Sequence, residues 1–159
     1  MIFLTTGTQL PFDRLVHALD EWAGRHPEAH VFGQIGATGY IPKHFEWERS
    51  ISPTQFEARI SACETVVAHA GMGTIISGIE WGKRVVVMPR LAAFHEQRND
   101  HQLATVERLE HLQGLKVVHT PEALCEVLSE SPARVGTEML ETDPQLIRAI
   151  RDFSGLQAA

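Results

Sequence analysis

Short apolar runs alternate along the chain with segments whose apolar residues recur at the spacing of an amphipathic helix. The strand-like runs cover residues 1–4, 29–32, 65–68, 85–88 and 115–119. The helical patterns cover about 11–22, 53–62, 73–81, 99–112 and 121–128. Because the two kinds of segment alternate, we predict an α/β fold, a Rossmann-like parallel sheet with helices on both faces.

The limits of the first helix are suggested by single residues. Pro11 suits the first turn of a helix, where its missing N–H costs nothing. Gly24 follows the last apolar residue of the pattern and is a typical C-terminal cap. We therefore expect a helix that starts near Pro11 and ends at Gly24.

Two further segments complete the predicted order. Residues 45–51 alternate apolar and polar side chains, which predicts a short extra strand. Asp143 followed by Pro144 is typical of a helix start, and the apolar stripe behind them predicts a final helix over about 144–153. Residues 129–136 are the only loop-rich stretch, and no repeat or linker divides the chain. We expect one domain over residues 1–159 with a separate C-terminal helix.

Composition narrows the class of protein. A chain of 159 residues can bury a sizeable core. The net charge is -6, from 14 basic and 20 acidic residues, so the chain lacks the positive charge expected of a nucleic-acid-binding protein. No apolar stretch approaches the ~18 residues that a membrane-spanning helix needs, and no signal peptide is visible, so we expect a cytoplasmic chain. Cys63 and Cys125 lack the spacing of a redox or metal motif, so we expect both to remain thiols.

Two turns rich in small residues follow predicted strands. The first reads Thr-Thr-Gly-Thr over residues 5–8, and the second reads Ala-Gly-Met-Gly-Thr over residues 70–74. A glycine turn that opens a helix presents backbone N–H groups to an anion, and phosphate is the usual occupant. In an open parallel sheet, ligands bind outside the carboxyl ends of the strands. Both turns and the polar loop after Met88 should therefore meet at one crevice.

The spacing of these motifs resembles that of a known family. The sequence HAGMGT, followed by GK, an apolar strand ending in Pro89 and then DHQ, resembles the C-terminal domain of glycosyltransferase family 28. The opening IFLTTGTQLPFDRLV is similar to single-domain members of that group, which are soluble subunits of two-component transferases. They include bacterial exopolysaccharide transferase subunits and the eukaryotic subunit that adds N-acetylglucosamine to a dolichol-linked sugar.

This resemblance implies one half of a GT-B fold, acting as the donor-binding subunit of an inverting, metal-independent glycosyltransferase. Such a subunit binds a UDP-sugar as its donor substrate, needs no cofactor and serves the transfer of a hexose to a lipid-linked acceptor. A complete GT-B enzyme needs about twice this length. We therefore expect a membrane-anchored partner that carries the acceptor domain and recruits the chain to the cytosolic membrane face. The alternatives are a non-catalytic nucleotide-sugar-binding module and a stand-alone UDP-sugar epimerase.

The glycine turns and the histidine beside them form the expected diphosphate site. His69 ends a strand, and the resemblance implies a hydrogen bond from it to the leaving phosphate or to the sugar ring. Because imidazole titrates near neutral pH, His69 is our candidate catalytic residue, with the acceptor-activating base left unassigned. A buried, hydrogen-bonded histidine and a plain tight turn are the alternatives. The residues expected to contact the diphosphate or face the cleft are Gly7, Thr8, Gly71, Met72, Gly73 and Thr74.

The polar loop after Met88 supplies the candidates for sugar recognition. By the resemblance, Asp100, His101 and Gln102 contact the hydroxyl groups of the hexose. The alternative is a helix start, because Asn99 and Gln102 have the spacing of a capping box. The His and Glu residues in this loop match no metal-ligand spacing, so no metal site is predicted.

The helix after the second glycine turn supplies the candidates for the ribose. Family members often carry a carboxylate there that bonds the nucleotide ribose, whereas this chain has Ser77 at the aligned position. Glu80 lies one turn further along the same face, roughly 4.5 Å along the axis. Either Glu80 reaches back to the ribose or Ser77 makes a weaker contact. A solvated helix residue is the alternative role of Glu80.

Overall fold

A parallel sheet of six strands forms the centre of the protein, and the computed structural model describes residues 1–130 of the chain. The helix expected over 144–153 lies outside the described residues. The order across the sheet is β3-β2-β1-β4-β5-β6, and every neighbouring pair is parallel. This order is that of a Rossmann-like fold, which confirms the predicted fold class. The strands are β1 (Ile2–Thr5), β2 (Val31–Gln34), β3 (Glu46–Glu48), β4 (Thr65–His69), β5 (Arg84–Met88) and β6 (Leu115–Val117).

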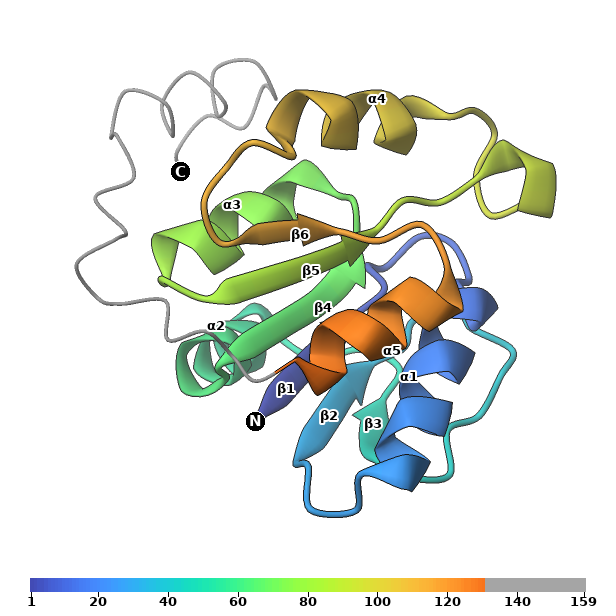
Figure 1. Ribbon diagram of the computed structural model, residues 1–159. Coiled ribbons are helices and arrows are strands. Elements are labelled where there is room, and N and C mark those ends of the chain that lie inside the picture. The colour runs from blue at the N-terminus through green and yellow to red at the C-terminus, as the bar shows by residue number, and fades with distance from the viewer. Residues whose placement is uncertain (131–159) are drawn as a thin grey trace.

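Helices cover both faces of the sheet (Figure 1). On one face, α1 (Asp13–Arg25) packs against α5 (Pro121–Ser129). The other face is covered by α2 (Pro53–Ala62), α3 (Met72–Glu80) and α4 (His101–Leu109), while the short 3-10 helix η1 (Ala92–Phe94) lies between β5 and α4. No helix within residues 1–130 is long and apolar enough to cross a membrane.

Strands β1, β2, β4 and β5 each contribute to two cores, because successive side chains of a strand point to opposite faces. Phe3 and Val66 join the core under α2, α3 and α4, whereas their neighbours Leu4 and Val67 join the core under α1 and α5. All four side chains are fully buried. Burial on both faces explains why the central strands read as continuous apolar runs in the sequence.

The first helix begins and ends later than its sequence suggests. Pro11 lies before α1, because the backbone N–H of Phe12 donates to the Thr38 hydroxyl and Phe12 becomes the N-cap. Gly24 lies inside the helix and is not its cap, so that expectation was wrong. A Cβ atom at Gly24 would lie 3.1 Å from the His44 ring, so the glycine serves the close approach of a neighbouring loop.

Other boundaries shift by a few residues. Strand β2 begins at Val31, since the N–H of Ala29 is held in a turn by the carbonyl of His26. Strand β6 and helix α4 are both shorter than predicted. The extra strand expected over 45–51 is β3, which pairs with β2 at the edge of the sheet.

The sheet has a topological switch point between β1 and β4. From β1 the chain continues to β2 and β3 on one side, and from β4 it continues to β5 and β6 on the other. The connection after β1 contains α1 and the connection after β4 contains α3, and these helices lie on opposite faces. The turns that leave the two strands therefore diverge, and such a point is where open α/β sheets bind ligands.

Candidate functional site

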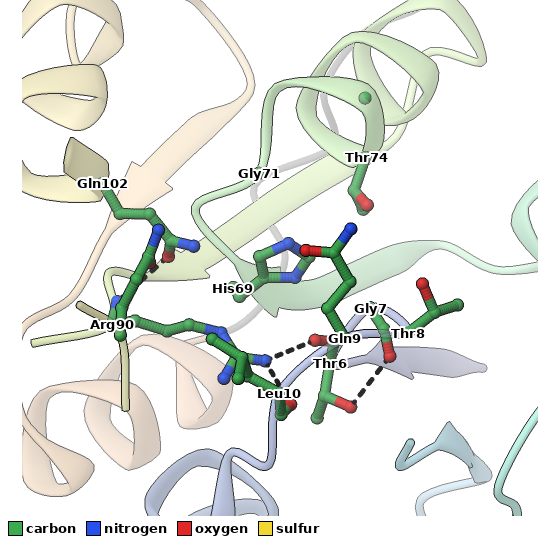
Figure 2. Close-up of a pocket in the computed structure, with 12 residues that line it drawn as sticks. Thr6, Gly7, Thr8, Gln9, Leu10, His69, Gly71, Thr74, Arg90 and Gln102 are labelled. Carbon is green, nitrogen blue, oxygen red and sulfur yellow. Dashed lines mark hydrogen bonds between the residues drawn. The ribbon is translucent and has the colours of Figure 1, made fainter. Parts of the chain in front are cut away.

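A cavity of about 590 Å³ opens at this switch point, and we refer to it as the central cavity (Figure 2). Its walls come from the turn after β1, the turn between β4 and α3, and the loop after β5. The structure thus brings together three segments that the sequence placed at one crevice. The predicted residues from the two turns that line the cavity are Gly7, Thr8, His69, Gly71, Gly73 and Thr74.

The imidazole of His69 lies between the two glycine turns. A Cβ atom on Gly7 would lie 2.9 Å from Cε1 of His69, and one on Gly71 would overlap Nε2. Gly7 also has a φ of 75°, which favours glycine. Both glycines therefore make room for the histidine ring, a role that sequence analysis did not assign to them. Their contact with a diphosphate stays a prediction.

His69 is an uncharged group in this environment. Burial of the imidazole, together with the guanidinium of Arg90, lowers the pKa of His69 to about 4. At neutral pH the ring can donate one hydrogen bond and accept one, but it carries no charge. Among the described residues, no group hydrogen-bonds to its buried Nδ1 atom. The Thr5 backbone lies close enough to oppose the lowering of the pKa of His69, but its contact is too poor in geometry to be a hydrogen bond to Nδ1.

The N-terminus of α3 opens onto the central cavity without a cap. Gly71 is the N-cap residue, and no side chain bonds to the first turn of this helix. A Cβ atom on Gly73, one residue into the helix, would meet no atom within 4 Å. The backbone N–H groups at this end carry the positive end of the helix dipole. This arrangement suits an anion that approaches through the space beside Gly73.

The sequence analysis missed five residues that line the cavity, which are Thr6, Gln9, Leu10, Arg90 and Gln97. Arg90 is only 3% exposed, yet its side chain lines the cavity. Gln97 also lines it, and in the described part of the chain nothing hydrogen-bonds to its buried Oε1 atom. The position of Arg90 just beyond the carboxyl end of β5 was an available signal. No comparable signal marked Gln97 within its polar loop.

The predicted sugar-binding residues have structural partners. Oε1 of Gln102 accepts hydrogen bonds from the backbone N–H groups of Ala70, at 3.1 Å, and Arg90, at 3.0 Å, so it ties the end of β4 to the end of β5. Gln102 lines the central cavity, whereas Asp100 and His101 do not. Asp100 accepts a hydrogen bond from the N–H of Ala92 at 2.9 Å.

The remaining predictions for this loop concern the cap and a metal. The side chain of Gln102 bonds to the strand ends, so no capping box forms with Asn99, whose own side chain accepts from the N–H of His101. Met72, at the start of α3, was predicted to contact the diphosphate but does not line the cavity. Within residues 1–130, no three His, Cys, Asp or Glu side chains gather in an arrangement that could hold a metal ion.

A second hollow of about 500 Å³ runs beside α2 and α3, and we refer to it as the α2–α3 groove. It shares Gly7, Thr8 and Thr74 with the central cavity. The two ribose candidates, Ser77 and Glu80, lie side by side in its wall. Across from them, α2 contributes a second carboxylate and an aromatic ring, which are Glu57 and Phe56.

Comparison with known proteins places this geometry in a family. The model of the glycosyltransferase family 28 C-terminal domain matches residues 1–139. No curated protein matches the sequence. Among solved structures, the glycotransferase of kitacinnamycin is similar, with a TM-score of 0.64 and 24% identity over 94% of this chain and 39% of that one.

Two further solved structures share the fold. MurG from Acinetobacter baumannii has a TM-score of 0.61 and 21% identity, covering 95% of this chain and 48% of its own. UDP-glucose:anthocyanidin 3-O-glucosyltransferase, solved in complex with UDP, has a TM-score of 0.62 and 13% identity, covering 95% of this chain and 35% of its own. The chain therefore spans less than half the length of these neighbours. Their likeness confirms the prediction of one half of a GT-B fold.

Proposed function

The chain belongs to the glycosyltransferase family 28 C-terminal domain family, and from that membership we propose that it binds the UDP-sugar donor of a hexosyl transfer. One observation carries the proposal. The uncapped N-terminus of α3 and the buried guanidinium of Arg90 face the same cavity at the switch point of the sheet. Both are positive, and their convergence suits the diphosphate of a nucleotide sugar.

The α2–α3 groove is the proposed place of the nucleoside. It adjoins the diphosphate site through Gly7, Thr8 and Thr74, so one ligand can occupy both hollows. Ser77 and Glu80 offer polar atoms to ribose hydroxyls, and Phe56 offers an apolar surface to a base. Uridine is the proposed nucleoside because one of the similar transferases was solved with UDP.

The hexose would then lie at the other end of the central cavity, near the loop after β5. Gln102 presents only its amide N–H groups there, because its oxygen is already bonded twice. Gln97 presents an oxygen without a partner among the described residues. A sugar hydroxyl both donates and accepts, so these two amides together complement one hydroxyl group. In this proposal Gln97 accepts a hydrogen bond from the sugar hydroxyl and Gln102 donates one to it. Asp100 stabilises the loop.

The proposed reaction is an inverting, metal-independent transfer. An acceptor hydroxyl attacks the anomeric carbon of the hexose, the bond from that carbon to the diphosphate oxygen breaks, and the acceptor's proton passes to a base. Arg90 and the α3 dipole would stabilise the charge that develops on the leaving UDP, so the chemistry proposed here needs no cofactor. His69, being neutral, would donate one hydrogen bond to the leaving phosphate or to the sugar ring.

The acceptor base is proposed to come from elsewhere. A pKa of about 4 makes the His69 imidazole a weak base at neutral pH. This favours a chain that holds the donor and receives its acceptor from a second domain or subunit. A membrane-anchored partner subunit that presents a lipid-linked acceptor at the cytosolic face is our proposal for that second half. Two exposed apolar side chains at the same edge, Leu10 at 40% and Phe94 at 59%, would suit its contact surface.

Calorimetry on the full chain tests the donor site. We expect binding of UDP, tighter binding of one UDP-hexose from a panel, and weaker binding of dTDP-hexoses. Absence of binding to every nucleotide sugar would contradict the proposal.

Transfer assays test the partner. The purified chain should transfer no sugar to lipid-linked acceptors until the membrane protein is added. Sugar transfer by the purified chain alone would contradict the need for a partner and leave the donor site intact.

A further inference from the structure

The guanidinium of Arg90 holds the turn that follows β1. It donates to the carbonyl oxygens of Thr6 at 2.7 Å, Leu10 at 2.8 Å and Pro11 at 2.6 Å. Figure 2 shows the Arg90 side chain extending from the end of β5 towards Thr6 and Leu10. The guanidinium also lies over the Phe12 ring, with Cζ 4.7 Å from its centroid. One side chain thus contacts the turn between residues 6 and 12 at four positions.

No carboxylate within residues 1–130 forms an ion pair with Arg90. The one hydrogen bond from Arg90 to Glu96 goes to the backbone carbonyl, at 3.3 Å. The Glu96 carboxylate is occupied by two hydrogen bonds from Arg14, each 2.9 Å, and by the N–H of Leu91. Carbonyl oxygens therefore accept the hydrogen bonds of Arg90, and the Glu96 carboxylate, which is bonded to Arg14, acts on the Arg90 charge only through space.

A buried charge without a direct counter-ion is costly, so a fold retains it where the charge serves a purpose. Here the charge lies in the wall of the central cavity, opposite the open N-terminus of α3. The turn that it holds supplies Gly7 and Thr8, which line both the cavity and the α2–α3 groove. The Arg90 side chain thus both holds the turn that lines the cavity and supplies positive charge to the cavity wall.

We propose that Arg90 is a positioning residue of the donor site, which holds the turn after β1 in its binding shape and presents to the diphosphate a positive charge that forms no ion pair within residues 1–130. This inference rests on the proposed function, because it takes the ligand of the cavity to be a nucleoside diphosphate. It assigns Arg90 two separable effects. The planar guanidinium shapes the turn through hydrogen bonds to three carbonyl oxygens, and its positive charge attracts the phosphates.

Two substitutions separate these effects. Arg90→Lys keeps the charge, but a single ammonium cannot span three carbonyl oxygens, so UDP affinity should fall by roughly fivefold. Arg90→Met removes both the guanidinium and its charge, and affinity for UDP and for inorganic pyrophosphate should fall by roughly thirtyfold. Circular dichroism at low temperature establishes that each variant is folded before titration.

The pKa of His69, followed by NMR of the imidazole, is a readout that a merely structural role would not move. The positive charge of Arg90 helps to lower this pKa to about 4. The pKa should stay low in Arg90→Lys and rise towards the ordinary value in Arg90→Met. An equal pKa in the two variants would overturn the assignment of a positive charge at Arg90 that acts on the cavity.

Arg49 provides a matched control. Its guanidinium donates to the carbonyls of Gly36 at 3.1 Å and Thr38 at 3.0 Å, and it packs over Trp47, so it ties a loop in the same way outside the cavity. Arg49→Met should lose some stability and keep full affinity for UDP and pyrophosphate. A loss of affinity equal to that of Arg90→Met would show that any tethering arginine suffices, and would overturn the proposal.

The remaining outcomes are distinct. If the wild-type chain binds neither UDP nor pyrophosphate, the proposed function fails and this inference fails with it. If the wild-type chain binds both and Arg90→Met binds them equally well, only this inference fails. If Arg90→Met does not fold, the UDP affinity of Arg90→Lys tests the proposal. Wild-type affinity in Arg90→Lys would overturn the role of the guanidinium in shaping the turn.

Discussion

The central cavity and the α2–α3 groove share the rim formed by Gly7, Thr8 and Thr74, yet they differ in chemistry. The cavity holds a buried guanidinium and a neutral imidazole. The groove holds two carboxylates and aromatic rings. Helix α3 belongs to both, since its N-terminus opens into the cavity and its side, with Ser77 and Glu80, forms a wall of the groove.

This difference shows how one strand-turn-helix unit can serve two parts of a ligand. The positive charge of the cavity comes from the backbone of α3 and from Arg90, so it depends little on which side chains α3 carries. The groove depends on those side chains, because a helix presents every third or fourth residue to one surface. We expect substitutions at the N-terminus of α3 to weaken the binding of any anion. Substitutions along the side of α3 should weaken only the binding of the nucleoside.

The largest expected effect comes from the two glycines at the start of α3. Gly73→Val places a side chain in open space within the cavity, so UDP affinity should fall by about a hundredfold, while stability changes little because valine is a better helix former than glycine. Gly71→Val should instead destabilise the fold by roughly 1–3 kcal/mol, because its side chain would overlap the His69 ring. Urea unfolding and calorimetry distinguish the two.

Gly71→Val is therefore a poor probe of the ligand, since loss of binding there would follow from the displaced imidazole. Gly73→Ala is the milder companion and should stabilise the helix slightly. Unchanged UDP affinity in Gly73→Val would remove the α3 N-terminus from the proposed diphosphate site.

The second prediction concerns His69 and pH. Its pKa is about 4 in the folded chain, below the ordinary value of 6.5, so the unfolded chain binds a proton first as pH falls. The folded state should therefore lose up to about 3 kcal/mol between pH 6.5 and pH 4, at 1.36 kcal/mol for each pKa unit. His69→Gln should flatten this dependence in urea unfolding. His17→Gln, at a histidine whose side chain is 50% exposed, is the control variant.

Ligand binding should change the same titration. A diphosphate in the cavity would offset the positive charge of Arg90, so saturation with UDP should raise the pKa of His69. A pKa that stays at its ligand-free value in the UDP complex would mean that the phosphates bind away from the imidazole.

The third prediction tests the sugar end of the central cavity. Gln97→Met keeps the length of the side chain but removes its oxygen, so affinity for the preferred UDP-hexose should fall by about tenfold while affinity for UDP is retained. Gln113→Met, at an exposed glutamine outside both hollows, is the control. Equal weakening of UDP and UDP-hexose would indicate that Gln97 supports the loop and does not contact the sugar.

The smallest expected effect lies in the groove. Glu80→Gln should lower UDP affinity by roughly fivefold and leave pyrophosphate affinity unchanged, because only the nucleoside reaches this helix face. Ser77→Ala should have a similar but weaker effect. A comparable loss of pyrophosphate binding would contradict the division between the two hollows.

Much of the fold could be predicted from the sequence, because its signals are local. A run such as residues 65–68, followed at once by a glycine turn and an apolar helix pattern, indicates a strand, a turn and a helix whatever surrounds them. Boundaries were less accurate where a distant side chain intervenes, as Thr38 does at the start of α1. The placing of both turns and the polar loop at one crevice also followed from the sequence, since parallel strands share one carboxyl edge.

The sequence by itself determined the α/β class, the family and the edge of the sheet at which the motif segments meet, because periodicity and motif spacing are properties of neighbouring residues. Only the tertiary structure decided how the candidate residues are used. It showed that Gly71 makes room for an imidazole, that the oxygen of Gln102 is already bonded to two strand ends, and that Arg90 holds a turn about eighty positions earlier in the chain. These contacts join segments distant in sequence, and their geometry depends on strand register and core packing, which no local pattern specifies.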